Sequence, residues 1–244
     1  MSPKSKNNLV AYGILSAVCL IVAFIAAIRP ELFAHGPPSF RLFLSIRGTA
    51  VIALLGLIGI LFLNRSTLRG LWDGNLTARQ KVLMPLVAGI VLGGVNVVLR
   101  QFIPIDAALT AFLQSQGAER IAPALAGAIL GYFSGGILIN IVYFLILIPP
   151  VVYLVSDRLL KGKKQAIVFW SIATPLALWE PLTNPPLSFS IEAFGAIGAL
   201  VIVVFGFIFC VMQAWFMRTF GFVALVFVRI GLYAVTHVLY PRFS

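Results

Sequence analysis

The stretch ALAGAILGYFSGGILINIVYFLILIPPVVYLV, residues 124–155, decides the fold, because it is apolar throughout and too long for one straight membrane crossing. It holds no charged residue. As a single helix it would be ~48 Å long at ~1.5 Å per residue, whereas ~20 residues cross a bilayer core. Proline cannot donate to the helix ladder, so Pro149-Pro150 is expected to end or kink this span at one membrane face.

The same stretch carries two further features upstream of the proline pair. Gly127, Gly131 and Gly135 recur at every fourth residue, which predicts a smooth helix face against which a neighbouring helix packs closely. Asn140 is an amide in wholly apolar surroundings. Because a polar side chain inside a membrane is costly, Asn140 is expected to bond to another polar group.

The composition indicates an all-α, polytopic transmembrane helix bundle. The chain of 244 residues is 61% apolar, with a mean hydropathy of +1.05, whereas soluble domains hold ~45–50% apolar residues. Residues 1–244 are interpreted as a single membrane domain. The first apolar run is long enough to span and is interpreted as an uncleaved helix rather than a signal peptide. About seven spans are predicted, at residues 8–28, 48–63, 82–99, 124–149, 165–179, 193–216 and 221–239.

Basic residues are divided unevenly between the two sides of this topology. The side that holds the N-terminus collects eleven Lys and Arg residues, including all six lysines, and the other side collects six. The positive-inside rule then predicts a cytoplasmic N-terminus and an outside C-terminus, in a bacterial-type plasma (inner) membrane. The same rule explains the net charge of +11, so no nucleic-acid partner is expected. The expected partners are the lipid bilayer and other membrane proteins in a complex.

Known catalytic signatures are absent from the sequence. It contains no Walker A motif, no H-E-x-x-H, no G-x-S-x-G and no paired carboxylates within the predicted spans. Cys19 and Cys210 fall in separate spans and are interpreted as small buried hydrophobes rather than as a disulfide or a metal site. No metal and no cofactor are therefore expected.

Arg229 is the most costly residue of the predicted spans, because an arginine near the membrane centre costs ~2.5–3.5 kcal/mol on insertion scales. It lies ~12 Å into span 221–239, at a depth similar to that of Asn140. Arg229 is expected to face the bundle interior and to donate to the Asn140 carbonyl, with Tyr143 or carbonyls freed by the prolines as further acceptors. Two interpretations of this pair stay open: a structural clamp between two helices, and a binding or relay site. Asn140→Leu is expected to destabilise the bundle more than Arg229→Met, since it leaves the guanidinium unpaired.

Two other titratable residues are predicted near the outer ends of spans. Glu180 follows Trp179 at the end of span 165–179 and is interpreted as an interfacial carboxylate. His237 lies one turn before Tyr240 and is interpreted as structural or solvated. Both are expected to lie away from the level of Asn140. No catalytic residue is assigned, and Glu180 and His237 are the candidates if the chain is an active enzyme.

The run GGILINIVYFLILIPPVVYLV, which begins at Gly135, resembles the core helix of the CPBP family, the CAAX-prenyl-protease and bacteriocin-processing intramembrane proteases. In that family the helix continues through a Glu-Glu-x-x-x-Arg motif. On this chain the two glutamates fall on Ile139 and Asn140, and the arginine falls on Phe144. The histidine of the family's second motif falls on Trp179.

The closing region FGFIFCVMQAWFMRTFGFVALVFVRIGLYAVTHVLYP resembles the last pair of helices of the same family. There the family's functional histidine falls on Arg229, the acid or amide that follows falls on Tyr233, and His237 matches a later histidine found in some members. The resemblance covers roughly residues 80–240 in hydropathy, glycine placement and spacing. It implies a bundle around a membrane cavity, with the motif helices facing that cavity.

The resemblance leaves three interpretations of function. The family's reaction uses a water activated by glutamate, and without either glutamate the mechanism lacks its base. The first interpretation is therefore a degenerate member, a pseudoenzyme that keeps the fold and acts as a binding or assembly subunit in the membrane. The second is an active CPBP-like intramembrane endopeptidase with displaced catalytic groups. The third is a small transporter or channel.

Overall fold

The computed structural model describes residues 2–33, 38–103, 125–183 and 187–242. All regular structure in these ranges is helical, which confirms the predicted all-α bundle. Seven helical segments are long and apolar enough to cross a membrane: Pro3–Ile28, Ile46–Arg65, Arg79–Phe102, Leu125–Leu159, Gln165–Thr183, Ser190–Phe220 and Phe222–Leu239. The number of spans agrees with the prediction. Residue 124, at which the fourth span was predicted to start, lies outside the described ranges.

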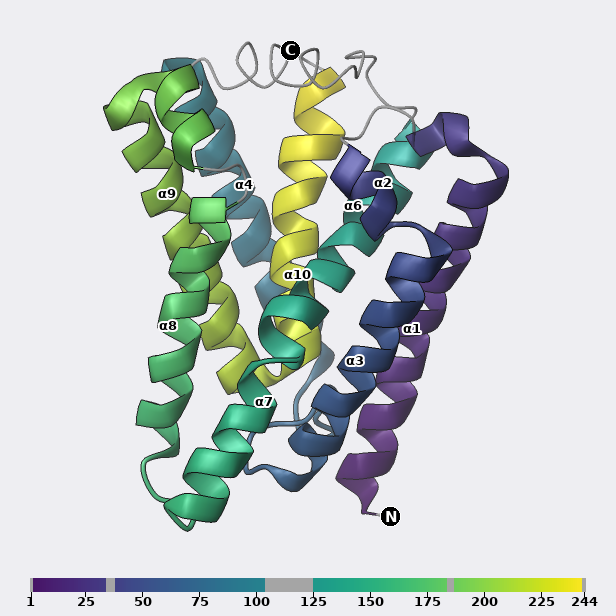
Figure 1. The fold of residues 1–244 in the computed structure, drawn as a ribbon, viewed down its shortest axis with the longest axis vertical. Coiled ribbons are helices and arrows are strands. Elements are labelled where there is room, and N and C mark those ends of the chain that lie inside the picture. Colours follow the sequence, from purple (N-terminus) through teal and green to yellow (C-terminus); the bar gives the residue numbers. More distant parts are fainter. Residues whose placement is uncertain (1, 34–37, 104–124, 184–186, 243–244) are drawn as a thin grey trace.

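The helices run along one another, with the two chain ends at opposite ends of the bundle (Figure 1). The long helices are α1 (Pro3–Ile28), α3 (Ile46–Arg65), α4 (Met84–Phe102), α6 (Leu125–Asn140), α8 (Gln165–Thr183), α9 (Leu187–Phe220) and α10 (Phe222–Tyr233). Shorter helices are α2 (Pro38–Phe43) and α7 (Ile148–Val151), with 3-10 turns at Pro30–Phe33 and Tyr240–Arg242. Wider π-helical turns occur at Arg79–Leu83, Ile141–Leu145, Val152–Leu159 and Ala234–Leu239.

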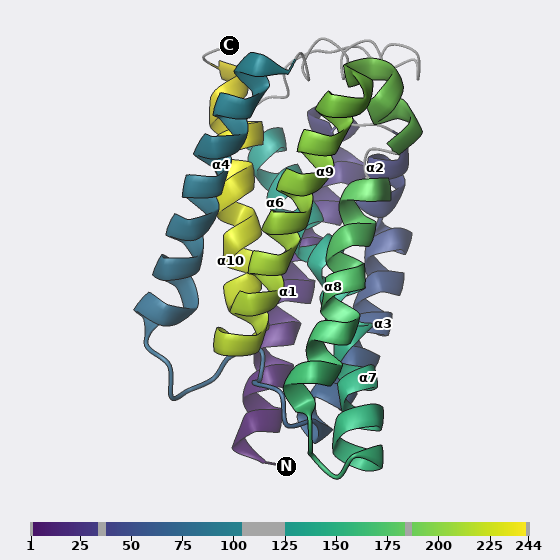
Figure 2. The same ribbon diagram turned by 90° about the vertical axis from the view of Figure 1, so that its left-hand side faces the viewer.

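Helix α10 lies at the centre of the bundle, where it packs against α4, α9 and α6 (Figures 1 and 2). Its span is 61% buried, whereas the span that contains α4 is only 17% buried and faces outward. A polar residue on α10 therefore faces other helices rather than lipid, which meets the condition under which a charge is tolerated within a membrane.

Glycines bring α4 close to α10. A methyl group on Gly89 of α4 would meet the Val228 carbonyl, whose carbon would lie only 2.9 Å away. A methyl group on Gly231 of α10 would in turn meet the Leu86 carbonyl and lie 2.9 Å from the Ile90 nitrogen. The lack of a Cβ at both positions lets the two backbones touch, as small residues do in membrane helix pairs.

The proline pair was predicted to end or kink the fourth span, and the span does not end there. After α6 the backbone widens into the π-helical turn at Ile141–Leu145 and is interrupted at residues 146–147 before α7 begins. Both prolines lie in the first turn of α7, where a missing N–H costs no helix bond. The helical path then continues to Leu159. The irregularity therefore precedes the prolines.

The predicted end of the fifth span is also wrong. Helix α8 continues past Trp179 to Thr183, so Glu180 and Pro181 lie inside a helix and not in an external loop at 180–192. A proline reads as a helix stop because it lacks the N–H donor. The bond lost at Pro181 is the one to the Ala177 carbonyl, four residues earlier. The Thr183 hydroxyl donates to carbonyls nearer the helix end, those of Trp179 at 2.9 Å and of Glu180 at 3.3 Å.

Candidate functional site

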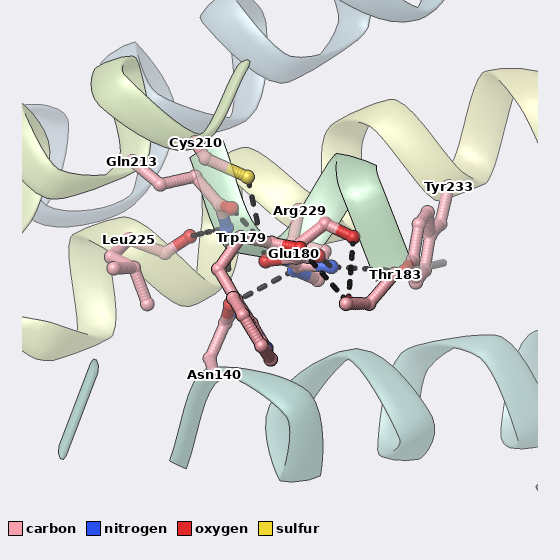
Figure 3. A network of polar contacts seen from close by, with 9 residues as sticks. All are labelled: Asn140, Trp179, Glu180, Thr183, Cys210, Gln213, Leu225, Arg229 and Tyr233. Carbon is pink, nitrogen blue, oxygen red and sulfur yellow. Dashed lines mark hydrogen bonds and ion pairs between the residues drawn. The ribbon is translucent and has the colours of Figure 1, made fainter. Parts of the chain in front are cut away.

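The guanidinium of Arg229 is the centre of a buried polar cluster (Figure 3). Its Nε donates to Oδ1 of Asn140 at 2.9 Å. Nη1 donates to Oε1 of Glu180 at 2.6 Å and to the Tyr233 hydroxyl at 3.1 Å. Nη2 donates to Oε2 of Glu180 at 2.9 Å and to Oε1 of Gln213 at 2.8 Å. A guanidinium has five N–H donors, so every one of them has an acceptor on this chain.

Four different helices supply these side chains. Asn140 is the last residue of α6, Glu180 lies near the end of α8, Gln213 lies on α9, and Arg229 lies on α10. Gln213 strengthens the connection, because its Nε2 donates to Oδ1 of Asn140 at 3.2 Å and to the Leu225 carbonyl at 3.3 Å. The network therefore joins α6, α8, α9 and α10 at one level of the bundle.

The cluster is closed off from the surroundings of the protein. Arg229 is 1% exposed, Glu180 is 7% exposed, and Asn140 and Gln213 are fully buried. An isolated charge would not be stable there, because its desolvation costs several kcal/mol. The two parallel bonds between Arg229 and Glu180 form the bidentate guanidinium–carboxylate pair that best offsets this cost.

Apolar groups around the guanidinium complete its surroundings. The Phe209 ring centroid lies 5.1 Å from Cζ of Arg229, within the range of a cation–π contact. Gly136 on α6 makes room for the stem of the arginine, since a methyl group there would lie 3.2 Å from Cδ of Arg229 and 3.3 Å from Cε2 of Tyr233. A side chain at position 136 would therefore be tight against the stem of Arg229 and the ring of Tyr233.

Glu180 holds the position that the sequence prediction placed incorrectly. Its carboxylate is buried against Arg229, at the level of Asn140, and is not interfacial. The thiol of Cys210 also donates to Oε2 of Glu180 at 3.4 Å. Cys210 is thus a hydrogen-bond donor to the ion pair and not merely the small hydrophobe that the sequence indicated.

The other predicted site residues lie in different surroundings. Asn140 and Tyr233 both contact Arg229, and the expected Asn140–Arg229 pair is present. Tyr143 is half-buried in the apolar core and is not among the partners of Arg229. His237 is half-buried, stacked on the Tyr132 ring at 4.3 Å and edge-on to Tyr233 at 5.0 Å. His237 is therefore next to the cluster but outside it: its ring contacts Tyr233, and Tyr233 in turn accepts a hydrogen bond from Arg229.

Gln213 is the cluster member that the sequence analysis did not select. The sequence carried a signal for it, because Gln213 is the only amide in the predicted span 193–216. A polar side chain within a span is costly unless it forms a hydrogen bond, so Gln213 could have been expected to bond to another polar group, as Asn140 was. Its distance from Arg229 along the chain gave no indication that the two meet.

The amide nitrogen of Asn140 remains unused. Nδ2 of Asn140 is buried and has no acceptor among the described residues. The same residues contain no group of three His, Cys, Asp or Glu side chains that could hold a metal ion. The cluster can therefore fix four helices in register and offer an amide donor to one further acceptor.

Fold and site together define an integral membrane protein, an all-α bundle with seven candidate spans, four of which are joined inside by a charged cluster. Comparison of the chain with protein-family models, with curated proteins and with solved structures gave no match. The lipid-facing helices imply direct contact with a bilayer.

Proposed function

We propose that this chain is a non-catalytic binding or assembly subunit of the membrane, in which the Arg229 cluster locks the helices that present its outer surface. The observation that carries this proposal is the complete use of the guanidinium donors by the chain itself. A charged group kept for a substrate would leave donors directed at that substrate. Here they hold α6, α8, α9 and α10 together.

The resemblance to the CPBP family supports a degenerate origin for the cluster. The positions onto which it places a glutamate, a histidine and an acid or amide are occupied by Asn140, Arg229 and Tyr233, and these three meet in the structure. The position of the second histidine is Trp179, whose neighbour Glu180 completes the ion pair. We infer that a catalytic constellation has been replaced by a structural one at the same place.

The presence of Glu180 favours one alternative function, an active CPBP-like endopeptidase with a displaced base. Glu180 is an acid next to Arg229, one of the positions where the resemblance places catalytic residues, and an acid there could activate a water. Both of its oxygens, however, accept hydrogen bonds from Arg229, and Oε2 also accepts from Cys210. The hydrogen-bonding capacity of this carboxylate is therefore directed to side chains of the chain itself, as in a structural guanidinium–carboxylate pair.

Peptide hydrolysis by the purified, reconstituted protein separates these two functions. The proposal expects no turnover above that of empty liposomes, with Glu180→Gln giving the same result. Hydrolysis that is present in the natural sequence and lost in a Glu180→Gln protein that thermal unfolding shows to be folded would establish the endopeptidase instead. A variant at the exposed surface, Lys163→Gln, serves as the matched control for protein quality.

Photo-crosslinking in native membranes tests the assembly role. A crosslinking residue at Val91 of α4, which is 60% exposed, and another at Ile14 of α1, also 60% exposed, sample two outward faces. The proposal expects a protein adduct of one reproducible mass from at least one face. Lipid adducts alone from these and the other outward faces would contradict it.

A further inference from the structure

A cavity of about 420 Å³ opens at the end of the bundle that holds the N-terminus, away from the Arg229 cluster. Its wall is formed by the first turns of α1, including Lys4 and Asn7, and by the segment 67–75 that follows α3. Arg69, Trp72 and Asp73 are the chemically distinctive residues of that segment. The cavity therefore combines basic, amide and aromatic groups.

Buried hydrogen bonds hold the wall in place. Oδ1 of Asn8 accepts from the Leu71 backbone N–H at 2.7 Å, and Nδ2 of the same side chain donates to Asn64 at 2.7 Å. Asn8 is fully buried. Nζ of Lys4 donates to the Ser66 and Leu68 carbonyls, each at 2.8 Å. The segment is thus tied to α1 in a fixed shape, which lowers the entropy cost of binding a ligand.

The cationic groups of the cavity keep donors to spare. An ammonium group has three protons, and Lys4 uses two of them on the carbonyls named above. Arg69 donates through Nη1 to Oδ2 of Asp73 at 2.7 Å, and its other N–H groups have no acceptor within the described part of the chain. Oδ1 of Asp73 accepts from the Asn75 backbone N–H at 3.0 Å, so both carboxylate oxygens are already bonded. Among the lining residues, Lys4 and Arg69 exceed Asp73 by one positive charge, and several of their donors remain for an anion. Asp157, which accepts from Thr67 at 2.8 Å, is the acid next to this wall.

The position of the cavity fits the level of lipid headgroups. Trp72 is 38% exposed, and Nζ of Lys81 lies 4.0 Å from its ring centroid. Tryptophan and basic side chains at the end of a span are typical of the membrane–water interface. The apolar spans begin immediately beside the cavity, at α1 and α3.

We propose that this cavity binds a phosphate group, and that the phosphate is carried by the headgroup of an anionic phospholipid. Lys4 and Arg69 supply charge-assisted donors to the phosphate oxygens, Asn7 supplies an amide donor, and Trp72 lies at the headgroup–acyl boundary. The site is independent of the Arg229 cluster and of the function proposed for it.

The test measures lipid binding to the full-length protein in neutral detergent, with phosphatidylglycerol as the probe and phosphatidylcholine as the uncharged comparator. Arg69→Gln and Lys4→Gln each remove one cation of the cavity. Lys163→Gln removes one cation from another loop at the same end and is the matched control. Thermal unfolding of each variant shows whether it is folded. If Lys4→Gln does not fold, Arg69→Gln alone serves as the test, because Arg69 is exposed and its hydrogen bond is to Asp73 in the same segment.

The proposal expects phosphatidylglycerol to bind at least about tenfold more tightly than phosphatidylcholine, and each cavity variant to lose about that preference, which is the size of one charge-assisted hydrogen bond. Lys163→Gln should change the affinity by less than about twofold, and Asp73→Asn should increase it, because the competing carboxylate is removed. Equal binding of both lipids, or equal losses in Lys163→Gln and Arg69→Gln, would overturn the site. Displacement of the lipid by inorganic phosphate or glycerol phosphate would assign the site to a soluble phosphate compound and refute the lipid as its source.

Discussion

At the scale of the residue, the main finding is that Arg229 and Glu180 form a buried pair within one chain. A buried ion pair is not by itself strongly stabilising, because desolvation offsets most of the attraction. Its value is specificity, since either charge alone is strongly disfavoured in that place. The pair therefore fixes the rotation of α10 relative to α8, and Asn140 and Gln213 add α6 and α9.

Glu180→Leu is expected to lower the free energy of unfolding by about 3 kcal/mol or more relative to the natural sequence. Arg229→Met is expected to lower it by less. The physical reason is that a carboxylate left alone can take up a proton, whereas a guanidinium always keeps its charge. The double change Glu180→Leu with Arg229→Met should recover much of the loss. Unfolding in detergent by urea or heat measures these effects, and simple additivity of the two changes would show that the residues are not coupled.

Asn140→Leu should cost less than Arg229→Met, the reverse of the order that the sequence predicts. That order assumed that Asn140 is the main partner of Arg229. In the structure Asn140 supplies one of the five acceptors of Arg229 and carries an unsatisfied Nδ2. Its replacement therefore loses two bonds, one from Arg229 and one from Gln213, and also removes an orphan donor. The same unfolding measurement decides the order, and a larger loss for Asn140→Leu would restore the original view.

At the scale of the element, packing of α4 on α10 depends on glycines at particular turns. Gly89→Ala is expected to destabilise the protein by about 1–3 kcal/mol, because the added methyl group meets the Val228 carbonyl, which cannot move aside. Gly94→Ala is the control on the same helix, since nothing lies within 4 Å of a methyl group there. It should be neutral, or stabilising by about 0.5–1 kcal/mol through helix propensity. Equal losses would show that helix propensity, not contact, governs these positions.

The segment between α3 and α4 is predicted to depend on pH through Asp73. The Asn75 backbone N–H, together with Arg69, holds the pKa of this carboxylate below its ordinary value. A carboxylate with a lowered pKa in the folded state stabilises the fold fully above its unfolded pKa of about 4 and ceases to do so as the pH falls through the lower folded value. The protection of residues 66–78 against hydrogen exchange, taken relative to the intrinsic rate at each pH, should therefore fall below about pH 4. In Asp73→Asn the rate at neutral pH should already be raised, and the acid effect should be smaller.

For the whole molecule, the charge distribution and the arrangement of the helices support the same orientation in the membrane. The lysines belong to the first turns of α1 and to the segments just before α4 and α8. These parts lie toward the end of the bundle where α1 begins, and the C-terminal end of α10 lies at the other (Figure 1). We propose on this basis that the N-terminus is cytoplasmic, in a bacterial-type plasma membrane.

Cysteine labelling tests that orientation. Lys163→Cys and Thr183→Cys place thiols on exposed residues at opposite ends of α8, whereas the natural Cys19 and Cys210 are buried. In intact cells a membrane-impermeant maleimide should label Thr183→Cys and should reach Lys163→Cys only after permeabilisation. Labelling in the opposite pattern would invert the topology, and labelling of both from outside would contradict the fifth span.

Local properties of the chain were sufficient to predict the membrane environment of this protein and the helical nature of its elements. Apolar runs of spanning length specify helices in a membrane, because no other local structure satisfies its own backbone there. The sequence also determined that Arg229 must face the interior, since the cost of a charge in lipid is a local property. Asn140 was identified as a partner because depth along two helices can be counted from their ends.

The tertiary structure alone decided which residues meet Arg229 and how the ends of the helices lie. Glu180 was missed because Pro181 reads locally as a helix stop, whereas packing carries α8 on to Thr183 and turns the carboxylate inward. Gln213 contacts Arg229 because of the rotation of α9 about its axis. That rotation is set by contacts across the bundle and cannot be read from the sequence of the span. Helix formation depends on neighbours in sequence, whereas rotation and register depend on neighbours in space, so only the former could be read from the chain.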